Sequence, residues 1–424
     1  MEESAPTVAT QNRAHEQLGR TTRAGLVIAI GVGFLVIFLT SSIKNVIPAY
    51  FVPMADYFGI SRATFAVGPT VFMVVYGLMS PVVGAMADRF GGRDTITAGL
   101  VLAGGCFLTS AAVPLYALFT VLYGVGAAIA FAAVSYIPVG VLVEELFPPE
   151  RRGLGYSILT NGTALGFIVL SPAWIILSRE TGWRVVFATL GLAFLVPLAL
   201  ATHLLIPSSS PTQEISAEPV APMSRRIALV LRTPGFWVLS GSFFGCGVTM
   251  GFIDVHVVAH MQEIQDSPTV ISSAMIVLGV MEIVGSIVAG RLCDRFHGRY
   301  VLCGAYALRG LALLTLISVP DAFGSFTFAA VFGISYMGSV IATTLYALDI
   351  FDSKSKGMAL GLIWLAHQFG AAISSEGGAV VFTEFGSYRI AIVGSAVIAL
   401  VSLLLVALIE PKRSKKELKD SARQ

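Results

Sequence analysis

Apolar residues fill long runs of the chain, and short segments with glycine, proline or charged residues separate these runs. A helix needs about 20 mostly apolar residues to cross the hydrocarbon core of a bilayer, and twelve runs reach that length. We therefore predict membrane-spanning helices at residues 24–47, 62–84, 95–115, 117–143, 154–177, 184–206, 235–259, 268–292, 300–319, 322–349, 357–382 and 388–409.

One long polar segment divides the predicted spans into six plus six. It covers residues 207–234, and its SRRIALVLR stretch has the pattern of a short interfacial helix. The expected fold class is thus an all-α membrane protein with twelve transmembrane helices in two six-helix halves. The expected parts are an N-terminal tail (1–22), an N-terminal half (23–206), a central loop (207–234), a C-terminal half (235–410) and a C-terminal tail (411–424).

The composition excludes several classes of protein. Of the 424 residues 55% are hydrophobic and only 12% are charged, whereas soluble proteins carry about 25% charged residues. A net charge of +2 is too small for the basic surface that nucleic-acid binding requires. The four cysteines lack C-x-x-C or metal-ligand spacing, so we interpret them as packing residues. We expect neither a metal nor a cofactor.

Basic residues are distributed unevenly between the two sets of loops, which predicts the orientation because Lys and Arg gather on the cytoplasmic side. With the N-terminus inside, four basic residues lie in or at the edge of the outer loops, namely Arg62, Arg179, Arg184 and Arg389, and two, Lys44 and Arg309, lie away from the ends of the apolar runs. The other 21 of the 27 lie in the tails and inner loops. We expect a multi-pass protein of the cytoplasmic (inner) membrane, with both termini cytoplasmic and no cleaved signal peptide.

The two halves resemble each other around one charged loop. The segment GAMADRFGGR at residues 84–93 recurs as GRLCDRFHGR at residues 290–299, and FPPERRG follows span 4 at residues 147–153. Two G-x-x-x-D-R-x-G-x-R loops at equivalent places in a twelve-span chain resemble the signature of the major facilitator superfamily of transporters. The resemblance covers residues 23 to 410, and parallel repeats of this kind are one way in which transporters are built.

The resemblance implies a conformational role for the repeated loops, which hold the two halves together in the outward-facing state of such transporters. Glu144, Glu145 and Asp349 are candidate partners at the inner ends of spans 4 and 10. The plainer interpretation is that the arginines only set the orientation. The residues assigned to gating are Gly84, Asp88, Arg89, Arg93, Gly290, Asp294, Arg295 and Arg299.

Ionisable residues inside the bilayer are costly and are functional candidates. Glu282 lies 12 residues before Asp294, and Arg309 lies 10 residues after Arg299, so both stand near mid-depth on consecutive helices. We predict an ion pair between Glu282 and Arg309, which either stabilises the fold or opens when a substrate or proton competes for it.

His367 and Gln368 lie near mid-depth on span 11, and His367 corresponds to Asn161 of span 5 at the repeat offset of 206 residues. We expect these polar positions to face each other across a central cavity. Histidine exchanges protons near neutral pH, so His367 is the first candidate for substrate contact or proton coupling. The alternative is a structural hydrogen bond between helices.

Two further groups lie toward the outer ends of predicted spans. Lys44 resembles the lysine by which monocarboxylate porters receive an anion, although a long side chain that reaches the interface is an equal alternative. Asp254, His256 and His260 close span 7, and we favour outer hydrogen bonds over a shared metal there.

The nearest branch by resemblance is that of monocarboxylate porters and oxalate–formate antiporters, but this chain departs from it. Span 8 carries Glu282 where the branch has an arginine, and span 11 carries His367 where oxalate exchangers have a lysine. The sequence therefore makes a dicarboxylate doubtful. It favours a monocarboxylate-like acid, and a neutral vitamin such as riboflavin is an alternative that fits a hydrogen-bonding site.

We expect a secondary transporter, not an enzyme, that takes up a small organic metabolite by alternating access, with a proton as coupling ion. The chain lacks the G-x-x-x-x-G-K-[ST] motif of ATP-driven transport. The expected partners are the substrate, a proton and the lipid bilayer, without nucleic acid, and the expected state is a monomer. Drug or metabolite efflux, a membrane sensor and an intramembrane enzyme are the competing interpretations.

Overall fold

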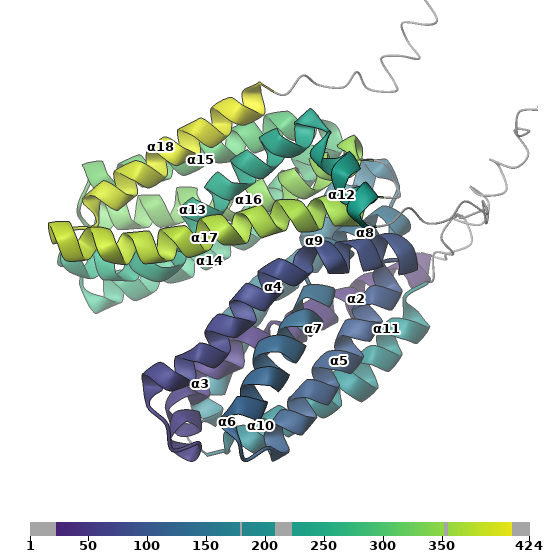
Figure 1. Ribbon diagram of the computed structural model, residues 1–424. Coiled ribbons are helices and arrows are strands. Elements are labelled where there is room, and N and C mark those ends of the chain that lie inside the picture. Colours follow the sequence, from purple (N-terminus) through teal and green to yellow (C-terminus); the bar gives the residue numbers. More distant parts are fainter. Residues whose placement is uncertain (1–22, 179, 208–222, 352–354, 409–424) are drawn as a thin grey trace, which may run out of the picture.

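The computed structural model describes residues 23–178, 180–207, 223–351 and 355–408. Within these ranges the chain is built from helices and contains no strand, and twelve helical stretches are long and apolar enough to cross a membrane (Figure 1). The predicted fold class and the twelve spans are confirmed. The N-terminal tail, the C-terminal tail, Arg179, Lys354 and residues 208–222 of the central loop lie outside the described residues.

The elements follow one another in a simple order. They are α2 (Arg23–Thr40), α3 (Ser42–Tyr57), α4 (Arg62–Phe90), α5 (Gly92–Ala112), α6 (Tyr116–Phe119), η1 (Thr120–Ala127), α7 (Ala128–Ala133), α8 (Tyr136–Leu146), η2 (Pro149–Arg151), α9 (Arg152–Leu177), α10 (Trp183–Ala193), η3 (Phe194–Leu198), α11 (Ala199–Leu205), α12 (Met223–Leu231), α13 (Pro234–Glu263), α14 (Pro268–Arg295), α15 (Gly298–Ser318), α16 (Ala322–Ile350), α17 (Lys356–Phe385) and α18 (Arg389–Ala407).

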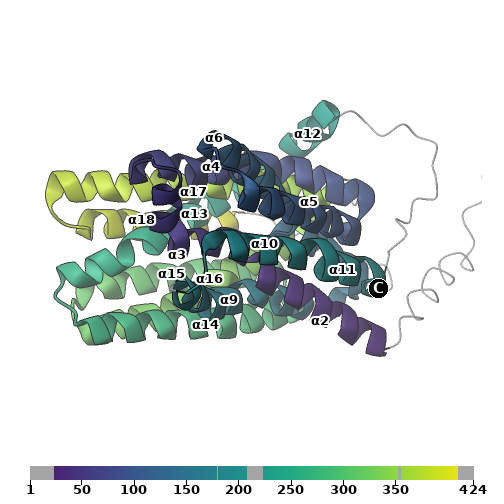
Figure 2. The same cartoon turned by 90° about the horizontal axis from the view of Figure 1, so that it is seen from below.

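Helices α2 to α11 form one bundle and α13 to α18 form a second (Figures 1 and 2). The bundles meet along two pairs of helices, because α4 packs along α17 and α9 packs along α14. They converge at the end that carries α8 and α12 and separate toward the other end (Figure 1). We call these the closed end and the open end. The segment SRRIALVLR forms part of the short helix α12, as predicted.

Glycines allow the two halves to approach each other at the closed end. A Cβ atom on Gly84 of α4 would collide with the backbone carbonyl of Gly357 on α17, and one on Gly290 of α14 would collide with that of Gly153 on α9. Small residues permit such close helix contacts inside a membrane. The same close approach therefore occurs twice, at positions that the sequence repeat relates.

The first span is longer than predicted, and it is broken. It runs over Gly25–Tyr57, ten residues past the predicted end, and α2 and α3 meet at Ser41. Pro48 lacks a backbone N–H and its ring crowds the carbonyl of Lys44, four residues earlier. Lys44 thus lies in the interior of the span, at a break, and not near its outer end.

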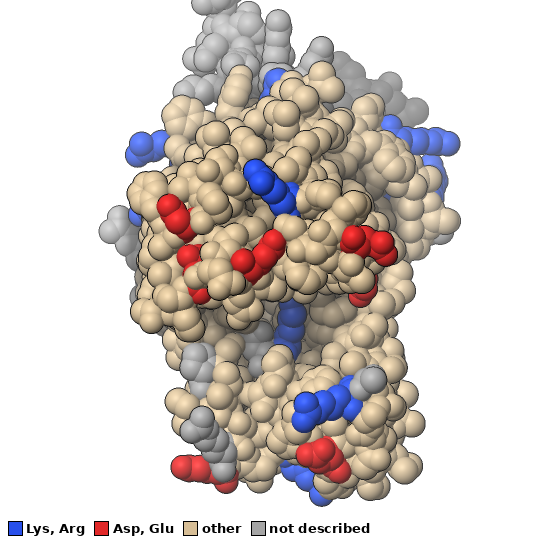
Figure 3. Space-filling model, turned by 90° about the vertical axis from the view of Figure 1, so that its left-hand side faces the viewer, with Lys and Arg blue, Asp and Glu red and all other residues tan. Residues whose placement is uncertain are grey.

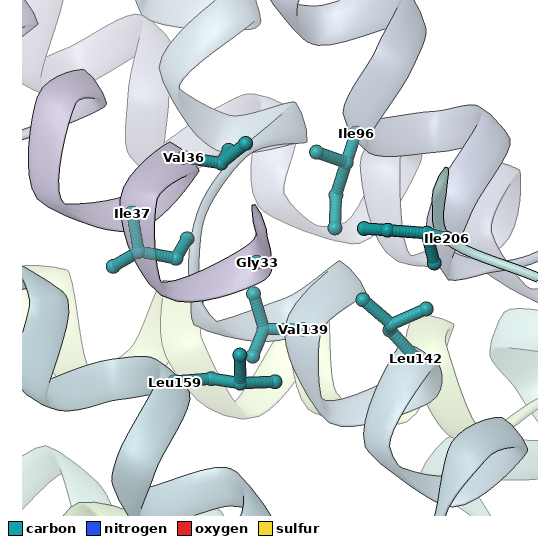
Figure 4. Close-up of a pocket in the computed structure, with 8 residues that line it drawn as sticks. All are labelled: Gly33, Val36, Ile37, Ile96, Val139, Leu142, Leu159 and Ile206. Atoms are coloured by element: carbon teal, nitrogen blue, oxygen red, sulfur yellow. The ribbon is translucent and has the colours of Figure 1, made fainter. Parts of the chain in front are cut away.

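The small apolar cavity in the N-terminal half is a packing gap. It measures about 10 Å³ and is lined by eight apolar residues, among them Val36, Ile96 and Leu142 (Figure 4). A buried water needs at least that space together with two to four polar partners, and this lining offers only apolar side chains. The cavity therefore does not serve as a binding site.

The glycine contacts lead to a test of helix approach. We expect Gly84→Val to destabilise the protein by about 1–3 kcal/mol, because the branched side chain must push α17 away. Gly304→Val is the matched control, since a Cβ at Gly304 meets no atom within 4 Å. Thermal unfolding of the purified variants measures both effects, and equal unfolding temperatures would contradict the contact.

Candidate functional site

At the closed end, each half supplies a carboxylate that caps a helix of the other half. Asp88 accepts hydrogen bonds from the backbone N–H groups of Gly357 (2.6 Å) and Met358 (3.1 Å). Asp294 accepts them from Gly153 (2.6 Å) and Leu154 (3.0 Å). A carboxylate at a helix N-terminus satisfies free N–H groups and opposes the helix dipole.

These carboxylates replace the usual capping residues of the two helices. The N-cap residues are Ser355 before α17 and Arg151 before α9. Neither makes a side-chain cap hydrogen bond to its own helix. The first turns of α9 and α17 therefore depend on the opposite half for these bonds. Separating the halves at this end would leave charged and polar groups to find other partners.

Further contacts of charged residues lie beside these two carboxylates. Glu144 binds Arg152 and Lys356, and Glu145 accepts a hydrogen bond from the backbone N–H of Gly92. Arg226 of α12 contacts Asp88 at 2.7 Å.

The signature arginines have other contacts. Arg93 pairs with Asp94 (2.7 Å) and Arg89 lies over the Phe90 ring. Arg299 donates to the Ala407 carbonyl, and the Arg295 side chain is exposed. Glu144, one of the acids predicted as partners, pairs with Arg152 and Lys356 and not with a signature arginine.

The predicted ion pair between Glu282 and Arg309 is wrong. Arg309 is fully buried within the C-terminal half and donates its hydrogen bonds to residues of α13 and α16. Glu282 lies on α14, is half-buried and interacts electrostatically with Asp254. None of the hydrogen bonds of Arg309 goes to Glu282.

Asn161, His367 and Gln368 lie at or beside the pairs of helices that join the halves. The Ser286 hydroxyl on α14 donates to the Asn161 amide oxygen on α9 at 2.6 Å. Gln368 packs against Gly77 of α4. The His367 ring is buried, lies beside Gln368 (Nδ1 to Oε1, 3.2 Å), and its Nε2 atom has no hydrogen-bond partner among the described residues.

The cleft at the open end brings opposite charges of the two halves near each other. Figure 3, which looks onto this end, shows a hollow between the halves with a basic side chain inside it. Lys44 and Asp254 are both exposed, and their charges interact across the cleft. The Tyr336 hydroxyl donates to both carboxylate oxygens of Asp254, at 2.8 and 3.1 Å.

The two histidines of α13 have separate partners. His256 Nε2 lies 2.7 Å from the Ser375 carbonyl, and His260 Nδ1 lies 3.3 Å from Glu263. Both rings pack near Tyr388. Each ring thus has its own hydrogen-bond partner near the open end, as expected for outer hydrogen bonds. The two rings do not share a partner.

Two six-helix bundles that join at one end around a cleft form the architecture of secondary transporters built from parallel repeats. The family model "Major Facilitator Superfamily" matches residues 30–374 and 255–424. The chain belongs to this family, and the resemblance noted in the sequence is confirmed.

Curated relatives and solved structures agree with this assignment. The MFS-type transporter YcxA of Bacillus subtilis (strain 168) is 27% identical over 79% of this chain and 83% of its own length. Human monocarboxylate transporter 12 is 25% identical over 86% of this chain and 76% of its own. The crystal structure of FucP in the outward conformation covers 92% of this chain and all of its own, with 13% identity and a TM-score of 0.71. That likeness concerns the fold alone.

Several important contacts could not be predicted from the sequence because one partner is a backbone group or a side chain of a type that is usually uncharged. Gly153 and Gly357, at the starts of α9 and α17, are offset by 204 residues, close to the repeat offset of 206. This offset is a weak sequence signal that the two helix starts are equivalent. The contact of Tyr336 with Asp254 and that of Cys246 with Arg309 have no such signal.

We expect Asp88→Asn to open the closed end more often, because an amide loses the charge-assisted hydrogen bonds, which contribute about 1.5–3 kcal/mol. The probe is a cysteine at Ser80, which is buried beside α17 near this end. Its alkylation by a maleimide should become about tenfold faster in the Asp88→Asn background.

Asp94→Asn is the control, because Asp94 is exposed and pairs with Arg93 on its own helix. An unchanged alkylation rate in Asp88→Asn would contradict a gating role for Asp88.

Proposed function

We propose that the protein is a secondary transporter for a small organic anion of the monocarboxylate type, working by alternating access between its two halves. The observation that carries this proposal is the place of Lys44. Of the two basic residues away from the ends of the apolar runs, Lys44 is exposed at the break of span 1, whereas Arg309 is fully buried. Lys44 is therefore the positive charge that a carboxylate entering the cleft would meet. The name of monocarboxylate transporter 12 supports the same substrate class.

The charges around Lys44 suggest how a proton accompanies the anion. In the empty cleft Lys44 compensates the negative charge of Asp254, which also interacts with Glu282. A bound carboxylate would neutralise Lys44 and leave two acidic side chains near each other. Like charges at close range favour proton uptake by one of them. Substrate and proton would then cross together, in the direction of uptake when the proton gradient points inward.

We infer the orientation of the protein in the membrane from the basic residues near the ends of the described helices. Arg89, Arg151, Arg225 and Arg291 belong to the closed end, whereas Arg62 and Arg389 begin helices at the open end. By the positive-inside rule the closed end faces the cytoplasm. The state described is then outward-facing, with Lys44 accessible from outside a cytoplasmic membrane.

A neutral aromatic solute is the second candidate, and one contact favours it. Tyr136 of the N-terminal half and Trp364 of the C-terminal half stack with ring centres 5.0 Å apart and an interplanar angle of 8°. A flat vitamin-like molecule can replace either ring in such a stack. This candidate does not need Lys44, which separates it from the anion proposal.

Uptake into proteoliposomes with an imposed inward proton gradient tests the two candidates. We expect accumulation of labelled monocarboxylates, and a loss of at least tenfold in Lys44→Gln because the anion loses its counter-charge. Arg62→Gln is the control, since Arg62 is an exposed residue at a helix start. Saturable uptake of riboflavin that Lys44→Gln leaves unchanged would favour the neutral solute. Export of hydrophobic drugs without either uptake would favour efflux.

A second prediction concerns proton coupling. We expect Asp254→Asn to abolish accumulation driven by the proton gradient while gradient-free exchange of labelled for unlabelled substrate continues, because exchange needs no net proton movement. His367→Ala tests the other candidate in the same two assays. If Asp254→Asn still accumulates substrate and His367→Ala does not, the coupling belongs to His367.

A further inference from the structure

A full positive charge lies inside the C-terminal half without a carboxylate beside it. Arg309 is 0% exposed, and arginine stays protonated in proteins. Among the described residues Arg309 makes no ion pair with Asp or Glu. Burying an unpaired charge is very costly. Asp254 interacts with Arg309 electrostatically but makes no ion pair with it, so we look for a compensating charge among the groups in direct contact.

The contacts of the guanidinium group identify the candidate. Nη2 donates to the Ser335 and Tyr336 carbonyls and to the Ser339 hydroxyl, at 3.0, 3.1 and 2.9 Å. Nη1 donates to the Thr249 hydroxyl at 3.1 Å and to the Cys246 sulfur at 2.9 Å. Of these five acceptors, only the sulfur belongs to a group that can ionise to an anion near neutral pH.

The contact between nitrogen and sulfur is short. N–H···O hydrogen bonds have donor–acceptor distances of about 2.9–3.0 Å, and sulfur is a larger atom than oxygen. A distance of 2.9 Å from Nη1 to Sγ is thus a close contact, which the charge of the guanidinium group strengthens. A neighbouring arginine also stabilises the thiolate form of cysteine.

The other titratable groups near the Cys246 sulfur have partners of their own. Tyr306 of α15 donates its hydroxyl to the Ser242 carbonyl at 2.7 Å, so its proton is directed elsewhere. His367 of α17 interacts with the sulfur, and Asp254 stands eight residues farther along α13. Tyr336 of α16 uses its hydroxyl for Asp254. The Ser339 hydroxyl lies 3.2 Å from the sulfur and Met250 Sδ lies 3.4 Å from it, so the 2.9 Å contact with Arg309 is the shortest of the three.

We infer that Cys246 is a thiolate and forms with Arg309 a buried ion pair that positions the Asp254 carboxylate of the cleft. The connection runs through Tyr336, because its backbone carbonyl accepts from Arg309 and its hydroxyl donates to Asp254. The pair also joins α13, which carries Asp254, to α15 and α16. The ion pair itself does not depend on the substrate, whereas the importance of Asp254 rests on the proposed function.

Infrared spectroscopy tests the charge state directly, because the S–H stretching band lies where proteins have little other absorption. At neutral pH, Cys246→Ala should leave the S–H band of the wild-type protein unchanged. Cys106→Ala is the matched control: Cys106 is a buried cysteine in the other half, has no arginine contact, and should lose its share of the band. An equal loss of S–H intensity in both variants would overturn the inference.

Stability measurements supply an independent readout. Cys246→Ala should lower the unfolding temperature by about 5–10 °C, since it leaves the guanidinium unpaired. Cys246→Asp should recover most of this loss, and the double variant Cys246→Ala with Arg309→Met should be more stable than Cys246→Ala alone. If Cys246→Ser is as stable as the wild type, a neutral acceptor is sufficient and the inference fails.

The consequence for the cleft is measured separately. The KM for exchange of labelled substrate should rise in Cys246→Ala and return toward the wild-type value in Cys246→Asp. If the infrared result holds while KM does not change, the thiolate exists but does not position Asp254. If wild-type protein exchanges no organic anion, the proposed function fails and the infrared result still stands.

Discussion

The mutual capping of helix N-termini by Asp88 and Asp294 is the interaction on which the arrangement of the two halves depends. Each carboxylate lies on one half and accepts hydrogen bonds from backbone N–H groups at the start of a helix in the other half. Glycines at the same level allow the helices to approach closely enough for these bonds. The halves converge at this end and separate toward the other, where the cleft that contains Lys44 and Asp254 is exposed.

The distribution of charge inside the bilayer follows from the cost of burying it. The chain has few charged residues, and those within the spans have identifiable surroundings. Lys44 and Asp254 are exposed in the cleft and compensate each other, whereas Arg309 is enclosed and surrounded by five acceptors. An accessible pair can change partners when a solute enters, and an enclosed charge cannot. This difference supports the proposed substrate contact at Lys44 and the positioning role inferred for Arg309.

The sequence predicted the twelve spans because the thickness of the bilayer imposes a length on each apolar run. It ended span 1 too early because Pro48, Pro53 and Asp56 have the character of a loop, although they lie in the same helical stretch. It paired Glu282 with Arg309 because the two residues stand at similar residue counts from the inner ends of their spans. It could not give the direction of each side chain around its helix axis, which depends on how the helices pack, and so it paired them wrongly.

Alternating access is the central claim, and paired distance measurements on the two ends test it most directly. Spin labels at Thr64 and Phe385 report the open end, and labels at Glu150 and Tyr300 report the closed end; all four residues are exposed. On addition of substrate and acid, we expect the first distance to shorten and the second to lengthen in the same molecules. Two distances that stay fixed, or that change in the same direction, would contradict the account.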